Sequence, residues 1–337
     1  MQKIKKRAYF FTTGLQSDTK LTLIALFGGI NLIKILHFYL PIPKRLHTFV
    51  MLFHDIKMEL TEQDIQKVQD TIKTVSSYDF SDYSYNSFCR RIEKILGDYN
   101  TTLDELLRNI QGNYNFMEKV VRDITVNTTE LFRDTDAWLK IRNILKQKFA
   151  SKESLHIWHA GCSSGQEVYS MMIMLCETGI FERASIYATD INENVLRTAM
   201  SGQYKYHEVQ DYLGNFDKVF NPKLHSEDVP YIDIHKYMDI NKTRDYVKME
   251  RGLVEKPLFF KHDLVSGEPI IARKLDIILC RNVLIYFNHD LQNRVLKFFH
   301  DNLADDGCLI IGRHEGMIGH VASLFDKKDS IYFKKTV

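Results

Sequence analysis

Short apolar runs alternate with segments of helical periodicity over the second half of the chain. The runs are rich in Ile and Leu, and they are LHIWHAG (155–161), ASIYATDI (184–191), LDIILCRNV (275–283) and GCLIIGRHE (307–315). Strands that alternate with helices are typical of a parallel sheet with helices on both faces. The pattern therefore predicts an α/β domain with a mostly parallel sheet over residues 126–337.

One stretch of this domain, from about 203 to 256, breaks the alternation. It is polar and rich in Tyr, and it contains short alternating pieces such as PYIDIHKYMDI and RDYVKMERG. It is also too long for a plain connection between two elements of a compact domain. We therefore expect a small antiparallel β-subdomain inserted at this point.

Residues 58–125 show only helical periodicity. In the segment NSFCRRIEKILGDY (86–99) the apolar side chains fall on one helical face, and Arg90, Arg91 and Lys94 fall on others. The segments TTLDELLRNI and NYNFMEKVVRDITV predict two more helices, the first with a Thr cap. The pattern predicts an all-α domain whose basic residues form either a solvated face or a contact surface.

The first 57 residues do not resemble the rest of the chain. Residues 21–40 are mostly apolar and basic residues precede them; about 20 apolar residues can span a bilayer. One interpretation is a membrane segment with a cytoplasmic N-terminus. Our hypothesis is that Met58 is the natural start and that 1–57 is a mis-assigned extension, because Thr61 is a good N-cap for the amphipathic run behind it.

Charge and cysteine content limit the classes of function. The formal net charge is +2, of which residues 1–57 carry +7 and the rest −5, so the chain is no obvious nucleic-acid binder. The five cysteines follow no C-x-x-C pattern, and no paired His spacing accompanies them. We therefore expect no metal site and no disulfide framework, and the composition fits the reducing cytoplasm.

Ligands of open parallel sheets bind at the carboxyl ends of the strands, and the first predicted strand end leads into a turn of small residues. This turn runs from Gly161 to Glu167. A carboxylate at the start of the following helix is a poor neighbour for a pyrophosphate but a good one for an amino group or ribose hydroxyls. The alternative for Glu167 is a helix-capping role favoured by the helix dipole.

Two further strand ends carry polar side chains. Asp190 lies 29 residues after Gly161, where an acid accepts hydrogen bonds from ribose hydroxyls or caps the next helix. Asp263 is placed to meet an adenine edge. Arg281 and Asn282 follow the most apolar strand, where buried polar groups need partners. Together the strand ends predict a nucleoside with an amino-acid tail and no phosphates, namely S-adenosylmethionine.

With these motifs in place, the sequence resembles the CheR-type chemotaxis protein-glutamate O-methyltransferases from about residue 60 to the C-terminus. The shared motifs are NTTELFRD (127–134), AGCSSGQEVYS (160–170), ATDIN (188–192), SGQY (201–204) and CRNVLIYF (280–287). The resemblance implies a class I, Rossmann-like methyltransferase domain dependent on S-adenosylmethionine. It also implies an N-terminal helical domain and a small β-subdomain inserted in the catalytic domain.

The resemblance further implies which residues form the site. Tyr286 would lie close to the transferred methyl group, and Arg133 and Tyr286 would be catalytic. The cofactor-binding residues would be Asn127, Thr129, Arg133, Glu167, Asp190, Asp263, Leu264, Asn282 and Val283. Asp263 departs from the Asn that the family often has. The run Gly312-Arg313-His314-Glu315 replaces the family's Gly-His-Ser-Glu, so no role is carried over from it.

The implied activity is transfer of the methyl group of S-adenosylmethionine to glutamate side chains of chemoreceptors, which leaves S-adenosyl-L-homocysteine. Arg90, Arg91 and Lys94 would face the receptor's cytoplasmic helices. The enzyme would be a cytoplasmic monomer without nucleic-acid partners, and it would reach the membrane only through receptors unless 21–40 is an anchor. The alternatives are a signalling module that binds S-adenosylmethionine and a methyltransferase with another protein acceptor.

Overall fold

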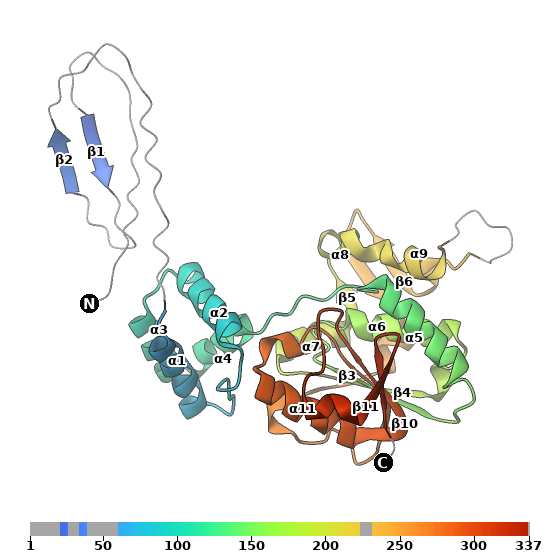
Figure 1. Ribbon diagram of the computed structural model, residues 1–337. Coiled ribbons are helices and arrows are strands. Elements are labelled where there is room, and N and C mark those ends of the chain that lie inside the picture. The colour runs from blue at the N-terminus through green and yellow to red at the C-terminus, as the bar shows by residue number, and fades with distance from the viewer. Residues whose placement is uncertain (1–20, 26–33, 39–59, 223–230, 336–337) are drawn as a thin grey trace, which may run out of the picture.

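The computed structural model describes residues 21–25, 34–38, 60–222 and 231–335 (Figure 1). Near the N-terminus, β1 (Leu21–Ala25) pairs antiparallel with β2 (Lys34–Phe38). The remainder of 1–57 and Met58 lie outside the described residues, so the membrane segment at 21–40 and the start at Met58 stay predictions. Among the residues that are described, no helix is long and apolar enough to cross a bilayer.

Four helices form a small domain of their own within residues 60–125 (Figure 1). They are α1 (Glu62–Val75), α2 (Tyr85–Asp98), α3 (Leu103–Gly112) and α4 (Tyr114–Ile124). Thr61 and Thr102 cap α1 and α3 as predicted, each in a reciprocal pair of hydrogen bonds with the acid three positions on. The predicted apolar face of α2 is buried in the core of this domain.

The larger domain is built on a sheet that has seven strands within the described residues. The strands are β3 (Leu155–Ala160), β4 (Ala184–Asp190), β8 (Leu258–Lys261), β9 (Leu275–Cys280), β10 (Leu303–Ile311), β11 (Phe325–Lys328) and β12 (Ile331–Lys334). Their order is β11-β12-β10-β9-β3-β4-β8, and the pairs from β10 to β8 are parallel. From β3 the chain continues to β4 and β8 on one side and then crosses to β9 on the other side of β3. Open α/β sheets bind ligands at such a topological switch point.

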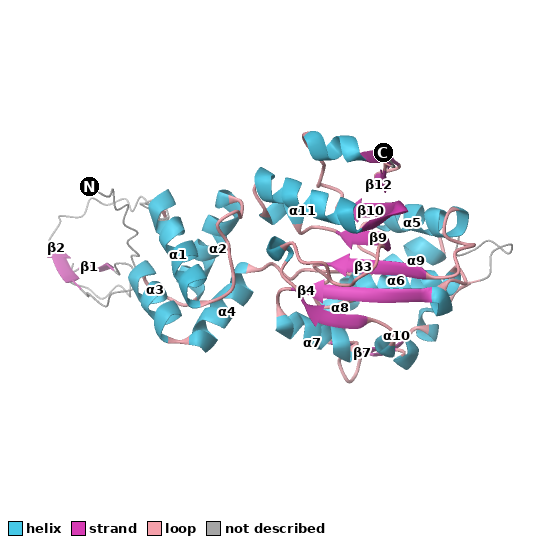
Figure 2. Cartoon of the chain, turned by 90° about the horizontal axis from the view of Figure 1, so that it is seen from below, coloured by secondary structure: helices cyan, strands magenta, loops and turns pink. Residues whose placement is uncertain are grey.

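Helices cover both faces of this sheet (Figure 2). One face carries α5 (Thr135–Gln147), α6 (Gln166–Glu177) and α7 (Glu193–Ser201), which share a core with Ile157 of β3. The other face carries α11 (His289–Asn302), which packs against Trp158. Alternate residues of β3 are therefore buried on opposite faces, as expected for a central parallel strand. The predicted α/β fold is confirmed.

The insertion combines a small antiparallel sheet with helices that the sequence pattern did not predict. The sheet has the order β5-β7-β6, from β5 (Gln203–Tyr204), β6 (Met238–Asn241) and β7 (Tyr246–Met249). The helices are α8 (Tyr206–Leu213), α9 (Asn215–Phe220) and α10 (Arg251–Glu255). Phe216 and Phe220 pack edge-on against Phe132, so burial against the loop before α5 favours helix here.

The helical domain is attached to the segment that follows β9. The Ser84 N–H donates to the Tyr286 carbonyl at 2.8 Å. Tyr83 forms an isolated antiparallel bridge with Phe287, and their ring centroids lie 5.2 Å apart. These contacts place the helical domain over the carboxyl edge of the sheet.

Candidate active site

A pocket lies at the carboxyl ends of β3, β4 and β9, and residues of the helical domain and of the linker complete its wall. All ten residues implied by the sequence resemblance line this one pocket: Asn127, Thr129, Arg133, Glu167, Asp190, Asp263, Leu264, Asn282, Val283 and Tyr286. The fold therefore brings together side chains from the linker, from the ends of the four strands β3, β4, β8 and β9, and from the short 3-10 turn Leu284–Tyr286.

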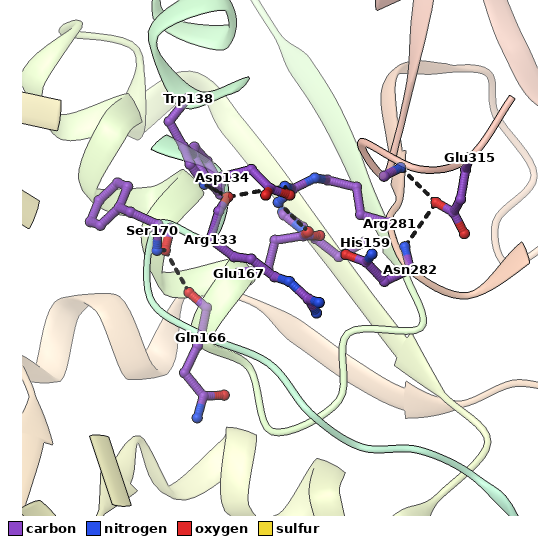
Figure 3. Close-up of polar contacts among 12 residues, drawn as sticks. Arg133, Asp134, Trp138, His159, Gln166, Glu167, Ser170, Arg281, Asn282 and Glu315 are labelled. Atoms are coloured by element: carbon purple, nitrogen blue, oxygen red, sulfur yellow. Dashed lines mark hydrogen bonds and ion pairs between the residues drawn. The ribbon is translucent and has the colours of Figure 1, made fainter. Parts of the chain in front are cut away.

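Arg133 stands on a constrained loop. Its neighbours Phe132 and Asp134 have φ values of 52° and 56°, a backbone conformation that bulky L-residues avoid. Trp138 Nε1 donates to the Arg133 carbonyl at 3.0 Å (Figure 3), and the Phe132 N–H donates to Ser170 Oγ at 2.8 Å. The backbone of Arg133 is therefore fixed, while its side chain lines the pocket.

The turn after β3 needs glycine because another segment packs against it. Gly161 has a φ of +78°, and a Cβ there would lie 2.5 Å from Cγ2 of Val283. On the other side of the turn, Ser163 Oγ donates to the Asn127 carbonyl at 3.1 Å. The turn therefore contacts both Asn127 and Val283, the two predicted cofactor-binding residues on either side of it.

Glu167 is in the first turn of α6, but two buried side chains hold its carboxylate. His159 Nδ1 lies 2.9 Å from Oε1, and Arg281 Nη1 donates to Oε2 at 3.2 Å (Figure 3). Burial alone raises the pKa of this carboxyl, but the hydrogen bond from His159 and the charge of Arg281 bring the pKa below its ordinary value. The partners of this carboxylate are therefore His159 and Arg281, while its place in the first turn of α6 is also the one that the helix dipole favours.

Asp190, which is buried, and Asp263, which is half-buried, are two further acids of the pocket. The two oxygens of Asp190 accept from the N–H groups of Ser163 and Asn192, each at 2.9 Å. Oδ1 of Asp263 accepts from the Val265 N–H at 2.9 Å. Burial raises the pKa of both carboxyls. Each oxygen keeps a second acceptor position, so both acids can still bind a ligand.

Asn282 also has a left-handed backbone, with a φ of 61°. Oε2 of Glu315 accepts from the N–H of Asn282 at 2.8 Å and from that of Gly312 at 2.6 Å (Figure 3), and Oε1 accepts from the Ile285 N–H at 3.3 Å. Burial raises the pKa of the Glu315 carboxyl. Glu315 therefore stabilises the turn that carries Asn282, although its sequence motif predicted no role.

Tyr286, Arg133 and Arg91 lie together at another part of the pocket. Burial raises the pKa of the Tyr286 hydroxyl, while the charges of Arg91 and Arg133 act to lower it. Arg91 of α2 thus reaches the pocket, whereas Arg90 is exposed and Lys94 pairs with an acid of its own helix. The three basic residues expected to face a receptor are divided between the pocket and the outer surface.

Three residues contribute to the site although sequence reasoning did not assign them to it, namely Tyr83, His159 and Glu315, and a fourth, Arg281, was singled out at its strand end without a partner or a role. His159 carried a signal, since it is a polar residue within an apolar strand. Arg281 carried one too, because a buried strand-end arginine needs a partner. Tyr83 carried none, because only the packing of the helical domain brings it to the pocket wall.

The donor and acceptor groups of the pocket fit S-adenosylmethionine. Glu167 provides a held negative charge for an ammonium group, and the two oxygens of Asp190 provide acceptors for ribose hydroxyls. Asp263 provides an acceptor for the amino group of adenine. These three carboxylates would repel phosphates, so the pocket suits a nucleoside with a cationic tail.

Comparisons with known proteins agree with this chemistry. The family model "CheR methyltransferase, SAM binding domain" matches residues 127–223 and 218–332. A Pseudomonas putida protein, whose name as methyltransferase Cher3 is provisional, is 33% identical over 260 residues, which is 76% of this chain and 90% of that protein. The chemotaxis protein methyltransferase of Borreliella burgdorferi is 30% identical over 225 residues, 64% of this chain and 72% of that one.

A solved structure gives a weaker likeness. Magnesium protoporphyrin IX methyltransferase from Synechocystis, with SAH bound, is 16% identical and covers 65% of this chain and 70% of its own, at a TM-score of 0.28. That TM-score is too low to add to the family match. The family match includes the Arg133 loop, the Gly161 turn and the strand ends of the pocket. This chain belongs to the CheR methyltransferase family, and its cofactor is S-adenosylmethionine.

Proposed function

We propose that this protein is a protein-glutamate O-methyltransferase that methylates chemoreceptors in sensory adaptation. One observation carries the proposal: a single pocket combines carboxylates suited to the cofactor with the cationic side chains Arg91 and Arg133 beside Tyr286. Positive charge at a methyl donor suits an anionic acceptor, and guanidinium is the side chain that best matches a carboxylate. The names of the similar proteins from Borreliella burgdorferi and Vibrio cholerae, chemotaxis protein methyltransferases, support the same activity.

A glutamate acceptor requires no general base. Its carboxyl, with an ordinary pKa of about 4, is already ionised at neutral pH. When bound, S-adenosylmethionine supplies an electrophilic methyl group on a sulfonium. The residues of the protein then have to attract the acceptor carboxylate, align one of its oxygens and exclude water around it. Arg133 can donate to both oxygens of a carboxylate, and the Tyr286 hydroxyl can donate one further hydrogen bond.

The positions of the helical-domain residues suggest how an acceptor helix would approach. Arg91 lines the pocket, so it would contact the acceptor carboxylate or its immediate surroundings. The exposed Arg90 and Lys94 would lie farther along the acidic receptor helix and contribute to encounter and orientation. In this proposal the enzyme works in the cytoplasm as a monomer on the cytoplasmic helices of the receptor.

The test is methyl transfer from labelled S-adenosylmethionine to membranes that contain chemoreceptors. Base-labile release of methanol is the readout, because methyl esters hydrolyse in base whereas N-methyl groups do not. We expect base-labile label on the receptors, and none on receptors whose acceptor glutamates are replaced by alanine. Absence of label, with cofactor binding shown by calorimetry, would instead favour a signalling module or a different protein acceptor.

A further inference from the structure

His159 of β3 makes a single polar contact from a fully buried position. Its side chain is 0% exposed, and Nδ1 lies 2.9 Å from Oε1 of Glu167. Nε2 has no hydrogen-bond partner within the described residues. Because a carboxylate can only accept, Nδ1 is the donor. Burying an imidazole with one unpaired nitrogen costs free energy, so the hydrogen bond to Glu167 is the polar role of this side chain.

Arg281 holds the other oxygen of the same carboxylate. Its side chain is 2% exposed, and Nη1 donates to Glu167 Oε2 at 3.2 Å. Nη2 donates to the Arg133 carbonyl at 3.0 Å and to Asp134 Oδ2 at 2.7 Å (Figure 3). One guanidinium therefore connects Glu167, a predicted cofactor-binding residue, with the loop that carries Arg133.

The Glu167 carboxylate remains available to a cationic ligand. The guanidinium of Arg281 is shared between the carboxylates of Glu167 and Asp134. The Glu167 side chain still lines the pocket and is 15% exposed. A carboxylate that is already held loses little conformational freedom when a ligand binds, and this preorganisation favours affinity.

We propose that His159 and Arg281 are positioning residues for cofactor binding. Each of them holds one oxygen of Glu167, so that this carboxylate is oriented to accept a hydrogen bond from the ammonium group of the cofactor. Arg281 also fixes the Arg133 backbone, so the same guanidinium sets the positions of the cofactor's amino end and of the catalytic arginine. The inference rests on the proposed function only in its ligand, S-adenosylmethionine, and does not depend on the identity of the acceptor.

The test is calorimetric binding of S-adenosylhomocysteine, which carries the same ammonium group, to the full chain. His159→Asn places an amide donor near the position of Nδ1, His159→Gln places it near that of Nε2, and His159→Leu removes it. We expect the Leu and Gln variants to raise the Kd by about tenfold or more and the Asn variant to stay within about threefold. Turnover at saturating S-adenosylmethionine should change little in the His159 variants, which separates KM from kcat.

His156→Leu is the matched control for these variants. His156 is on the same strand, but its Nε2 contacts Arg273 and not Glu167, so the Kd should not change. If His159→Leu does not fold, as judged by circular dichroism, the Asn and Gln variants still decide, because both are polar amides that differ in where the donor lies.

Arg281→Lys tests the second positioning residue. Lysine keeps the charge but loses the planar fork, so we expect a higher Kd and, because the Arg133 loop is released, lower turnover at saturating cofactor. An unchanged Kd in His159→Leu and His159→Gln, or an Asn variant as weak as the Leu variant, would overturn the positioning role. Receptors left unmethylated by a protein that binds S-adenosylhomocysteine normally would overturn the proposed acceptor alone.

Discussion

The two ends of the pocket differ in how firmly their charged side chains are held. At the cofactor end, both oxygens of Glu167 have buried partners, and both oxygens of Asp190 accept backbone N–H groups. At the acceptor end, the Arg133 guanidinium makes one hydrogen bond within the described residues, a long one of 3.4 Å to the Thr128 carbonyl. Arg91 lies beside the Tyr286 hydroxyl in this part of the pocket.

This difference matches the ligands that the two ends would receive. A small cofactor has the same shape at each turnover, so a preorganised set of acceptors gains affinity at no cost in adaptability. An acceptor glutamate would arrive on a large partner, and guanidinium groups with weak or neutral partners can adjust to it. Mutations at the two ends should therefore affect different measured quantities.

The largest effect is expected at Arg133. Removing its guanidinium in Arg133→Ala takes away alignment of the acceptor carboxylate, so turnover should fall by about a hundredfold or more. The measurement is the initial rate of receptor methylation at saturating S-adenosylmethionine, with unfolding by circular dichroism as the control. A loss below about threefold in a folded variant would remove Arg133 from the catalytic step.

A smaller effect is expected from Glu315→Gln, a substitution at the cofactor end of the pocket. The substitution weakens the acceptor for the N–H groups of Asn282 and Gly312, so the turn at Asn282 loses its support. The Kd for S-adenosylhomocysteine should rise about tenfold, and the protein should lose about 1–3 kcal/mol of unfolding free energy. Calorimetry and denaturant unfolding measure the two quantities. Loss of stability without a change in the Kd would mean that the turn is not part of the cofactor site.

Arg91→Ala should lower the rate of receptor methylation without changing cofactor affinity. Arg91 lines the pocket beside Tyr286, so we expect receptor methylation to fall about tenfold while the Kd for S-adenosylhomocysteine stays the same. Arg90→Ala is the matched control on the same helix, and its exposed side chain should matter less than about twofold. Equal losses in the two variants would show that α2 acts through its general charge.

The smallest effect is a dependence of stability on pH. The pKa of Glu167 lies below its ordinary value of 4.5, so the stability that its charge contributes is present above pH 4.5 and is lost as the pH falls through the lowered pKa. The difference in unfolding free energy between the unchanged protein and Glu167→Gln should therefore narrow in acid. Denaturant unfolding over a pH series measures it, and a constant difference would contradict the ion pair with Arg281.

Three acids of the site have raised pKa values, and their contributions to stability depend on pH in the opposite sense. The contributions of Asp190, Asp263 and Glu315 to stability are present at low pH and are lost as the pH rises through their folded-state pKa values. These three acids are present in the unchanged protein and in Glu167→Gln, so their contributions cancel from the difference in unfolding free energy between the two proteins.

Much of the fold could be predicted because it depends on local patterns. The apolar runs predicted four of the seven strands described in the large sheet, β3, β4, β9 and β10, and Thr61 and Thr102 marked helix starts, because periodicity and capping are properties of neighbouring residues. The helices α8 and α9 were not predicted, because packing of Phe216 and Phe220 around Phe132 favours them and that contact is distant in sequence.

The site, like the fold, could be predicted where it depends on local motifs and could not where it depends on tertiary contacts. Strand ends and motifs identified the residues that line the pocket, including Glu167 and Asp190. They could not show that His159 and Arg281 would hold Glu167, nor that Glu315 would accept from Asn282, since these pairs form only after the sheet has assembled. Arg91 could be predicted as a basic residue, but its place in the pocket follows from the docking of one domain on the other.

The bridge between Tyr83 and Phe287 has a consequence for how this family can diverge. Phe287 is adjacent to Tyr286, and Tyr83 itself lines the pocket, so the helical domain forms part of the pocket as well as the proposed contact surface for a receptor. A chimera that exchanged this domain for that of a relative would also exchange part of the cofactor wall. Under the proposed function, a change in the helical domain would therefore alter the receptor contact and the pocket lining at the same time.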